Sequence, residues 1–275
     1  MAVDVRSLFR IVGEAGSPAL RRVEQAVEWL LSPAAEGLGE KLLRLAHELH
    51  GEPLLIEASE HGQNAYFLDH KIRINPRHVD MAHIRNADGV LQPTSLEGAI
   101  AHELTHAGQK DFIEAALKRA AVEAEFQGKY MSRFSPEEIT AHNELLAQAM
   151  AAPDQQAGRA LIEQYVNKVS VPMGKALNAQ VAQHPEFIDY VERMEIPAIE
   201  NENKVLKIKG LPTRSDYVTS YHFSPEDYRE MMIGEMMEAM SINQKPLVAA
   251  GTAQRVDGRP WTAAIEPRTG RALGG

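Results

Sequence analysis

A five-residue stretch from His102 to His106 reads H-E-L-T-H and has the residue types and spacing of a metal-dependent hydrolytic site. Two histidines at this spacing project from the same face of an α-helix, where both imidazoles can bind one Zn²⁺ ion. Glu103 lies beside them and can reach metal-bound water, so it is the candidate general base. The alternative is a solvated helix face that holds these side chains by coincidence. A helix-capping sequence before the stretch and small residues at Ala99 and Ala107 favour the metal site.

A catalytic zinc usually has three protein ligands and a water, so a third ligand must come from outside this stretch. Glu125 follows His106 after a short return that a helical hairpin could close, and Glu123 lies two residues earlier. Both occur in a charged predicted helix, where the alternative is a carboxylate that faces solvent. Glu195 is the rival, much further along the chain. Spacing alone favours Glu125, and the residues by themselves leave the choice open.

The elements that must position these residues follow from hydrophobic periodicity and from helix-start signals. Two leucine-rich helices are predicted first, and short apolar runs between polar turn-formers then predict a small sheet. The sequence at 94–97 predicts the start of the helix that carries the H-E-L-T-H stretch. Residues 111–194 have an almost entirely helical pattern, and a last helix begins near Ser224. The predicted helices are 17–31, 38–50 and 94–108, and the predicted strands are 53–56, 65–68 and 71–74.

Composition restricts the class of protein. The 275 residues carry 29 basic and 38 acidic side chains, a net charge of -9, which disfavours binding to nucleic acid or to an anionic membrane. The chain has no cysteine, so any transition metal must be held by His, Asp or Glu. No long apolar run predicts a membrane span, and the first residues lack a cleaved signal peptide, so we expect synthesis in the cytoplasm.

Three segments resemble the zinc metallopeptidase effectors and toxin domains of bacteria, a gluzincin-like group that includes type III secreted proteases. These proteins have H-E-L-x-H-A, later E-x-x-A-x-x-x-E-N, and then G-L-P-x-R-x-x-Y. The chain has the three patterns in the same order at 102–107, 195–203 and 210–217. The resemblance covers 94–109 and 195–217 and leaves the rest of the chain unassigned.

The resemblance implies a role for each matching residue. It makes Glu195 the third zinc ligand, ahead of Glu125 and Glu123, and Glu202 a supporting carboxylate. Arg214 and Tyr217 are similar to the R-x-x-Y of clostridial neurotoxin light chains, in which they lie over the scissile carbonyl. The chain departs from the pattern at Leu206, where such segments often have Arg. It departs again at Pro197, which fits only if a helix begins near Glu195.

The sequence therefore predicts an α+β, zincin-like fold in which a small sheet precedes the active-site helix and the second half is mostly helical. The expected regions are 1–51, an N-terminal helical region; 52–243, a metallopeptidase domain with an inserted helical segment at about 111–194; and 244–275, a loosely ordered tail. The expected function is that of a secreted virulence effector or toxin, a hydrolase with one Zn²⁺ per chain that cleaves a protein of a host or target cell. The alternative is a non-catalytic helical interaction domain with a structural or vestigial zinc site.

Overall fold

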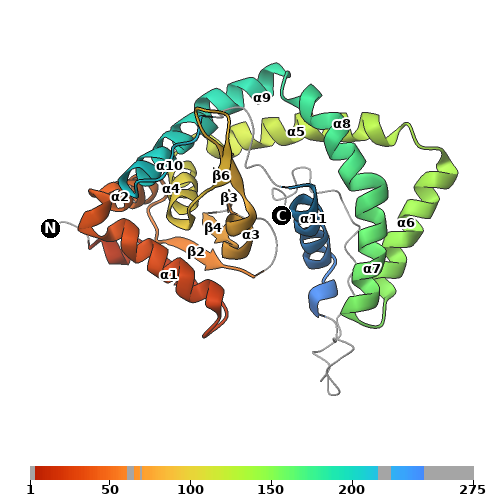
Figure 1. Ribbon diagram of the computed structural model, residues 1–275, viewed down its shortest axis with the longest axis horizontal. Helices are drawn as coiled ribbons and strands as arrows, with labels where there is room; N and C mark the ends of the chain where they lie inside the picture. The colour runs from red at the N-terminus through yellow and green to blue at the C-terminus, as the bar shows by residue number, and fades with distance from the viewer. Residues whose placement is uncertain (1–3, 61–64, 69, 216–223, 245–275) are drawn as a thin grey trace. The chain divides into compact units, whose positions relative to one another are not determined.

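The computed structural model describes residues 4–60, 65–68, 70–215 and 224–244 (Figure 1). Within the chain, contacts separate two compact units: residues 1–118 with 185–227, and residues 119–184 with 228–275. The chain enters the second unit within helix α5 (Phe112–Met131), returns to the first between His184 and Pro185, and enters the second again within helix α11 (Pro225–Ala239). Each unit has its own hydrophobic core.

A four-stranded mixed sheet forms the β part of the first unit, with strand order β1-β2-β4-β3. β1 (Phe9–Val12), β2 (Leu54–Ala58) and β4 (Lys71–Ile74) run parallel, and the edge strand β3 (Ala65–Leu68) runs antiparallel to β4. Alternate residues of β2 and β4, among them Ile56 and Ile72, are fully buried against the helices. A small hairpin, β5 (His83–Arg85) with β6 (Leu91–Pro93), comes directly before the helix that carries the H-E-L-T-H stretch. The strands expected near 53–56, 65–68 and 71–74 are confirmed, whereas β1, β5 and β6 were not predicted.

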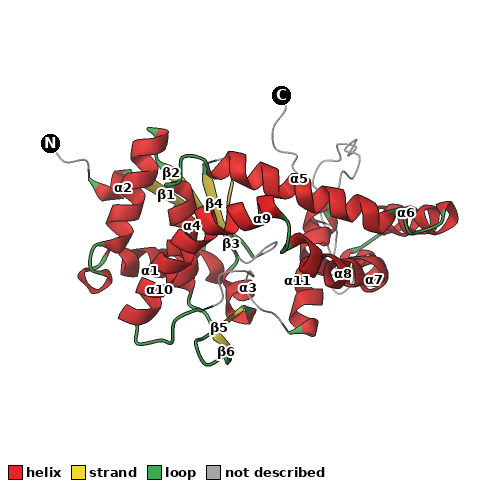
Figure 2. Ribbon diagram, turned by 90° about the horizontal axis from the view of Figure 1, so that it is seen from above, coloured by secondary structure: helices red, strands yellow, loops and turns green. Residues whose placement is uncertain are grey.

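Helix α4 (Leu96–Ala107) lies at the centre of the first unit, and it packs against α1 (Pro18–Leu31), α2 (Leu38–His50), α10 (Ile196–Ile208) and strands β3 and β4 (Figures 1 and 2). Every residue from Gly98 to Ala107 is buried, as expected for a helix enclosed on all sides. The Ser95 hydroxyl accepts a 2.9 Å hydrogen bond from the Gly98 N–H, so Ser95 and not Thr94 caps the helix. α1 and α2 contribute to the same core as the sheet and α4, so residues 1–51 are part of this unit.

Shorter helices complete the first unit, and five longer ones contribute to the second. The first unit also contains η1 (Val5–Ser7), η2 (Pro33–Ala35), α3 (Pro76–Met81) and α9 (Pro185–Tyr190). The second contains the later part of α5, α6 (Pro136–Ala151), α7 (Gln155–Tyr165), α8 (Val171–Val181), most of α11 and a turn at Ile242–Gln244. Its core joins α6, α7 and α11 through Leu146, Ile162 and Ile233. The helical pattern of 111–194 is confirmed, and 119–184 of it lies in the second unit.

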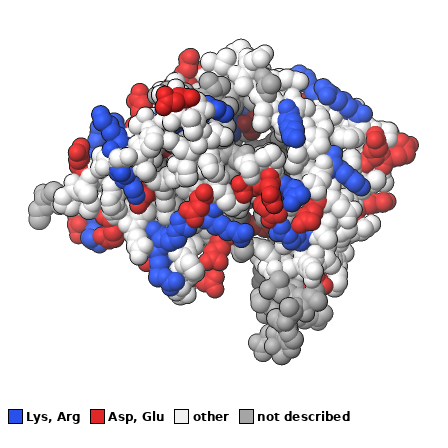
Figure 3. All heavy atoms as spheres, viewed as in Figure 1, with Lys and Arg blue, Asp and Glu red and all other residues white. Residues whose placement is uncertain are grey.

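The coarse prediction of an α+β chain with a small sheet and a mostly helical second half is confirmed. Within the part of the chain that the structure describes, no helix is both long and apolar enough to cross a membrane. The face in Figure 3 carries acidic and basic side chains interspersed with one another. Residues 245–275, almost all of the expected tail, lie outside the described residues.

Candidate metal centre

Three side chains from two helices converge in the first unit. His102 and His106 lie one turn apart on α4, and Glu195 comes directly before α10. The two Nε2 atoms are 3.1 Å apart, and the Glu195 carboxylate lies 3.3 Å from Nε2 of His102 and 3.7 Å from Nε2 of His106. Both histidines are buried, and the Glu195 side chain is 21% exposed. These three residues could hold one metal ion, and among the described residues they are the group with this geometry.

A widened helical turn carries Glu195 to this position. Residues Val191–Glu195 form a π turn, in which the N–H of Ile196 donates to the carbonyl of Val191, five residues earlier. Pro197 explains the widening, because proline has no N–H and its ring crowds the carbonyl four residues before it. The same arrangement recurs in the second unit, where a π turn at Val166–Ser170 comes just before Pro172. Pro197 therefore lies in the first turn of α10, which begins at Ile196. The helical backbone nevertheless continues into α10 from α9 through the π turn, so Glu195 lies within a helical segment and not at its entrance.

Hydrogen bonds hold the outer sides of His106 and Glu195. Nδ1 of His106 lies 2.8 Å from Oε1 of Gln109, just past the end of α4. The Tyr190 hydroxyl donates a 2.8 Å hydrogen bond to Oε1 of Glu195. Phe112 packs its ring beside the His106 imidazole, with 4.4 Å between the ring centroids. The orientation of these two candidate ligands is thus restricted on the sides that face away from the metal position.

A buried carboxylate orients the other histidine. Glu202 is fully buried on α10, and its Oε2 lies 3.4 Å from Nδ1 of His102. The Thr94 hydroxyl donates to Oε1 of Glu202 at 2.9 Å, and a guanidinium nitrogen of Arg214 lies 3.4 Å from Oε2. Burial alone raises the pKa of Glu202, but the hydrogen bond to His102 and the charge of Arg214 outweigh it and hold the pKa below its ordinary value. Glu202 is therefore an ionised acceptor behind His102.

The carboxylates around His102 control its protonation in the metal-free protein. Burial lowers the pKa of His102, but hydrogen bonds to Glu195 and Glu202 outweigh this effect and raise the pKa to about 10. Burial raises the pKa of Glu103 to about 7, against the opposing charge of His102 and a hydrogen bond to the backbone of Phe67 on β3. A metal ion must therefore displace a proton from this site, and Glu103 can change protonation near neutral pH.

The alternative third ligands lie elsewhere. Glu125 and Glu123 both belong to the second unit, where they pair with Lys129 and Arg119 on their own helix. The Glu125–Lys129 pair is exposed and the Glu123–Arg119 pair is half-buried. Ion pairs between neighbouring turns are typical of a solvated helix face, which was the other interpretation of these residues. Of the three carboxylates weighed from the sequence, the structure brings Glu195 to the histidines.

The segment after α10 places Arg214 beside Glu202. Asn203 accepts a 2.7 Å hydrogen bond from the Arg214 N–H and donates a 2.8 Å hydrogen bond to the Arg214 carbonyl. The Arg214 side chain is 3% exposed, and its guanidinium lies 3.4 Å from the Glu202 carboxylate. The guanidinium thus neutralises a carboxylate that orients His102, and its expected role over a scissile carbonyl stays a prediction. Tyr217, its expected partner, lies outside the described residues.

Two supporting residues, Gln109 and Tyr190, were not predicted. Gln109 lies three residues beyond His106, and Tyr190 lies five residues before Glu195. Gln109 also reaches the carbonyl of Met194, far along the chain, whereas Tyr190 contacts Glu195 within one helical segment. The sequence feature that could have indicated Gln109 is Pro197, because a proline has no N–H and leaves a backbone carbonyl of the preceding turn in need of another donor.

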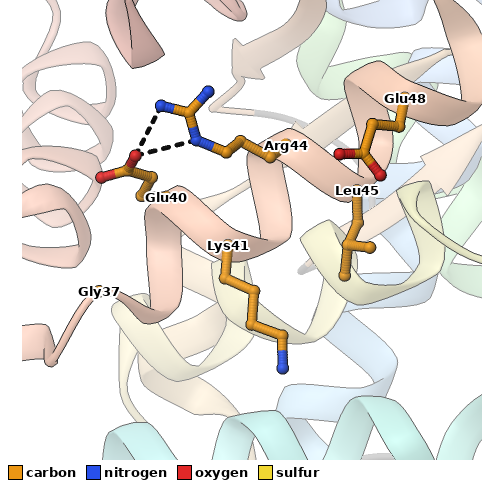
Figure 4. A pocket seen from close by; sticks show the side chains of 6 residues that line it. All are labelled: Gly37, Glu40, Lys41, Arg44, Leu45 and Glu48. Carbon is orange, nitrogen blue, oxygen red and sulfur yellow. Dashed lines mark hydrogen bonds and ion pairs between the residues drawn. The ribbon is translucent and has the colours of Figure 1, made fainter. Parts of the chain in front are cut away.

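A separate hollow on α2 contains none of the candidate metal ligands. It has a volume of about 460 Å³ and is lined by Gly37, Glu40, Lys41, Arg44, Leu45 and Glu48 (Figure 4). Arg44 donates hydrogen bonds of 2.9 and 2.6 Å to Glu40, and Lys41 points away from this pair. An exposed ion pair between neighbouring turns explains this arrangement without a ligand.

The chain matches no protein-family model, no curated protein and no solved structure. What the site does is therefore inferred from its own geometry and chemistry.

Proposed function

We propose that the protein is a zinc-dependent metallopeptidase with a zincin-like fold. The observation that carries the proposal is the convergence of His102, His106 and Glu195 on the helix that also carries Glu103, a buried carboxylate. A site that only stabilises the fold needs no such base, whereas a hydrolytic site does. The small sheet packed against α4 agrees with a zincin-like arrangement.

The spacing of the ligand atoms supports zinc. A tetrahedral zinc ion about 2.0–2.1 Å from each ligand atom separates those atoms by about 3.3–3.4 Å. In the site the two Nε2 atoms are 3.1 Å apart, Oε2 of Glu195 lies 3.3 Å from Nε2 of His102, and Oε1 of Glu195 lies 3.7 Å from Nε2 of His106. One ligand atom from each of the three residues lies within 4.8 Å of the other two. Two imidazoles and one carboxylate also form a donor set that catalytic zinc uses, with a remaining position for water. The residues present therefore fit the ion.

The proposed mechanism assigns one task to each residue. Bound zinc would supply a Lewis acid that polarises a peptide carbonyl and lowers the pKa of water. Glu103 takes the proton from that water and passes it to the leaving amine, which requires a pKa near the working pH. Glu202 and Gln109 keep the imidazoles of His102 and His106 oriented. Tyr217 stays a predicted donor to the oxyanion, and its Tyr217→Phe variant should lower kcat by about ten to a thousand-fold.

A comparison of wild type with Glu103→Gln tests this proposal, and Glu24→Gln serves as control because Glu24 is an exposed residue of α1. We expect all three proteins to bind about one zinc per chain, and wild type and Glu24→Gln alone to produce new fragments in a lysate of candidate target cells. Zinc binding with the same fragments from Glu103→Gln would refute the assigned base. Zinc binding without any hydrolysis would favour the alternative, an interaction domain with a structural zinc.

The class of substrate and the setting are part of the same proposal. The sequence resemblance favours an effector or toxin that is made in a bacterial cytoplasm and acts on a protein of a host or target cell. The lysate comparison tests this choice directly, because fragments that appear in host lysates and not in bacterial lysates would support it.

A further inference from the structure

Gln109 connects the two segments that supply the candidate ligands. Its Oε1 lies 2.8 Å from Nδ1 of His106, and its Nε2 donates to the carbonyls of Met194 at 3.0 Å and Arg193 at 3.5 Å. These carbonyls come directly before Glu195. We propose that Gln109 is a positioning residue that fixes the tautomer of His106 and holds the backbone from which Glu195 reaches the metal. This inference rests on the metal centre of the proposed function, but not on peptide hydrolysis.

The orientation of the Gln109 amide follows from the groups around it. Backbone carbonyls can only accept hydrogen bonds, so the NH₂ group must face Met194 and Arg193. The amide oxygen then faces His106, and an oxygen can only accept. Nδ1 of His106 must therefore carry the proton, which leaves Nε2 of the neutral ring with its lone pair directed at Glu195 and His102. This tautomer is the one that binds a metal through Nε2.

Pro197 explains why a side-chain donor is needed at this place. In a regular helix the N–H of residue 197 would donate to the carbonyl of Arg193, but proline has none. The π turn at Val191–Glu195 shifts the neighbouring backbone hydrogen bonds as well. The Met194 carbonyl is half-buried and accepts the shorter hydrogen bond from Gln109, at 3.0 Å, whereas the contact with the Arg193 carbonyl is exposed and longer, at 3.5 Å. A half-buried carbonyl without a donor is costly, and Gln109 supplies that donor from the end of α4. One amide thus compensates the proline and orients a ligand.

The chemistry of Gln109 is specific. A methionine at this position has similar length but neither donates nor accepts, so both connections are lost. A glutamate can accept from Nδ1 of His106, but its oxygens repel the carbonyls of Met194 and Arg193. The two variants therefore separate the role toward His106 from the role toward the Glu195 backbone.

The test measures zinc affinity by competition with a chelator and the His106 tautomer by ¹⁵N NMR of the imidazole. The matched control is Gln92→Met, because Gln92 also donates from its amide to a backbone carbonyl, that of Pro212, at 2.7 Å. We expect Gln109→Met to lower zinc affinity about 10–100-fold, the range for groups that orient a metal ligand. We expect Gln109→Glu to retain the Nδ1–H tautomer with a smaller loss of affinity, and Gln92→Met to leave both readouts unchanged.

A second background makes the inference refutable even if Gln109→Met is unstable. Pro197→Ala restores the backbone N–H, so the loss of affinity from Gln109→Met should be smaller in Pro197→Ala than in the wild type. Equal zinc affinity and an unchanged tautomer in wild type, Gln109→Met and Gln109→Glu would overturn the inference, as would an equal loss in Gln92→Met. A protein that binds zinc as described but hydrolyses nothing would refute the proposed function and leave this inference intact.

Discussion

Replacement of Arg214 by methionine discriminates between the two roles that this residue has been given. Arg214 is 3% exposed and Glu202 is fully buried, and their charged atoms are 3.4 Å apart. Removal of one partner from a buried ion pair costs about 3–5 kcal/mol, because the other charge is left uncompensated. Glu202 keeps Thr94 and His102 as partners, so we expect a loss near the lower end, about 3 kcal/mol in the free energy of unfolding of the first unit.

The assay is thermal unfolding of the zinc-free protein. At about 2–4 °C per kcal/mol for a domain of this size, Arg214→Met should lower the first unit's Tm by about 6–12 °C. The control is Arg22→Met, which removes an exposed pair with Asp80 and should cost at most about 1 kcal/mol. The combination of Arg214→Met with Glu202→Leu should cost less than the sum of the two single changes, because neither member of this ion pair is then left buried without the other.

The opposite outcome would restore the role implied by the sequence resemblance. If Arg214→Met keeps its Tm and its zinc affinity but lowers kcat, the guanidinium acts on the substrate, and its contact with Glu202 is incidental. A fall in Tm and in zinc affinity, with kcat of the zinc-loaded enzyme nearly unchanged, identifies Arg214 as the counter-charge of Glu202.

Three further predictions concern the same unit. Glu195→Gln should weaken zinc binding far more than Glu125→Gln, as measured by chelator competition, because only a ligand gives the ion a charged oxygen; release of zinc by Glu125→Gln would show that the wrong ligand was chosen. In the zinc-free protein, the pKa of His102 is raised from 6.5 to about 10 and that of Glu103 from 4.5 to about 7, so the folded state retains protons that the unfolded state releases. The stability that these two protonated groups give the folded state is therefore lost as pH rises, and Tm should fall between pH 7 and 10, mainly through deprotonation of His102. A rise in Tm over this range would show that the pKa of His102 is not raised in the folded protein. Gly98→Leu should lower Tm and zinc affinity together, because a Cβ at Gly98 already lies only 3.0–3.3 Å from side-chain atoms of the cap and of α10, and overpacking costs about 1–3 kcal/mol; normal values for both measurements would show that the two helices can separate without consequence.

Local sequence signals were sufficient wherever one segment decides its own structure. Apolar spacing identified α1 and α2, and the serine-proline starts of α1 and α6 are N-caps in the structure. The H-E-L-T-H spacing required His102 and His106 to share a helix face, because the period of the helix places them one turn apart. Short strands such as β1 and β5 carry too few residues for their alternation to be distinguished from a loop.

Tertiary structure decided which distant groups meet. Spacing along the chain favoured Glu125, since a short return costs less loop-closure entropy than a long one. The packing of α10 on α4 outweighs this cost by burying apolar residues such as Ile199 and Val205, and it brings Glu195 and Glu202 to the two histidines. The spacing of residues within either segment does not predict that these two helices pack together.

The sequence by itself determined the two histidines, the adjacent carboxylate of Glu103 and the helix that carries them, because one helical turn is a local property. The third ligand was suggested only by resemblance, and the supports Gln109 and Tyr190 were found only in the fold. The position of Arg214 was also decided there, because a guanidinium is stabilised by whichever carboxylate lies near it after folding, and that carboxylate is Glu202. Hydrogen bonds and ion pairs between segments distant in sequence depend on distance in space, which the order of residues does not specify.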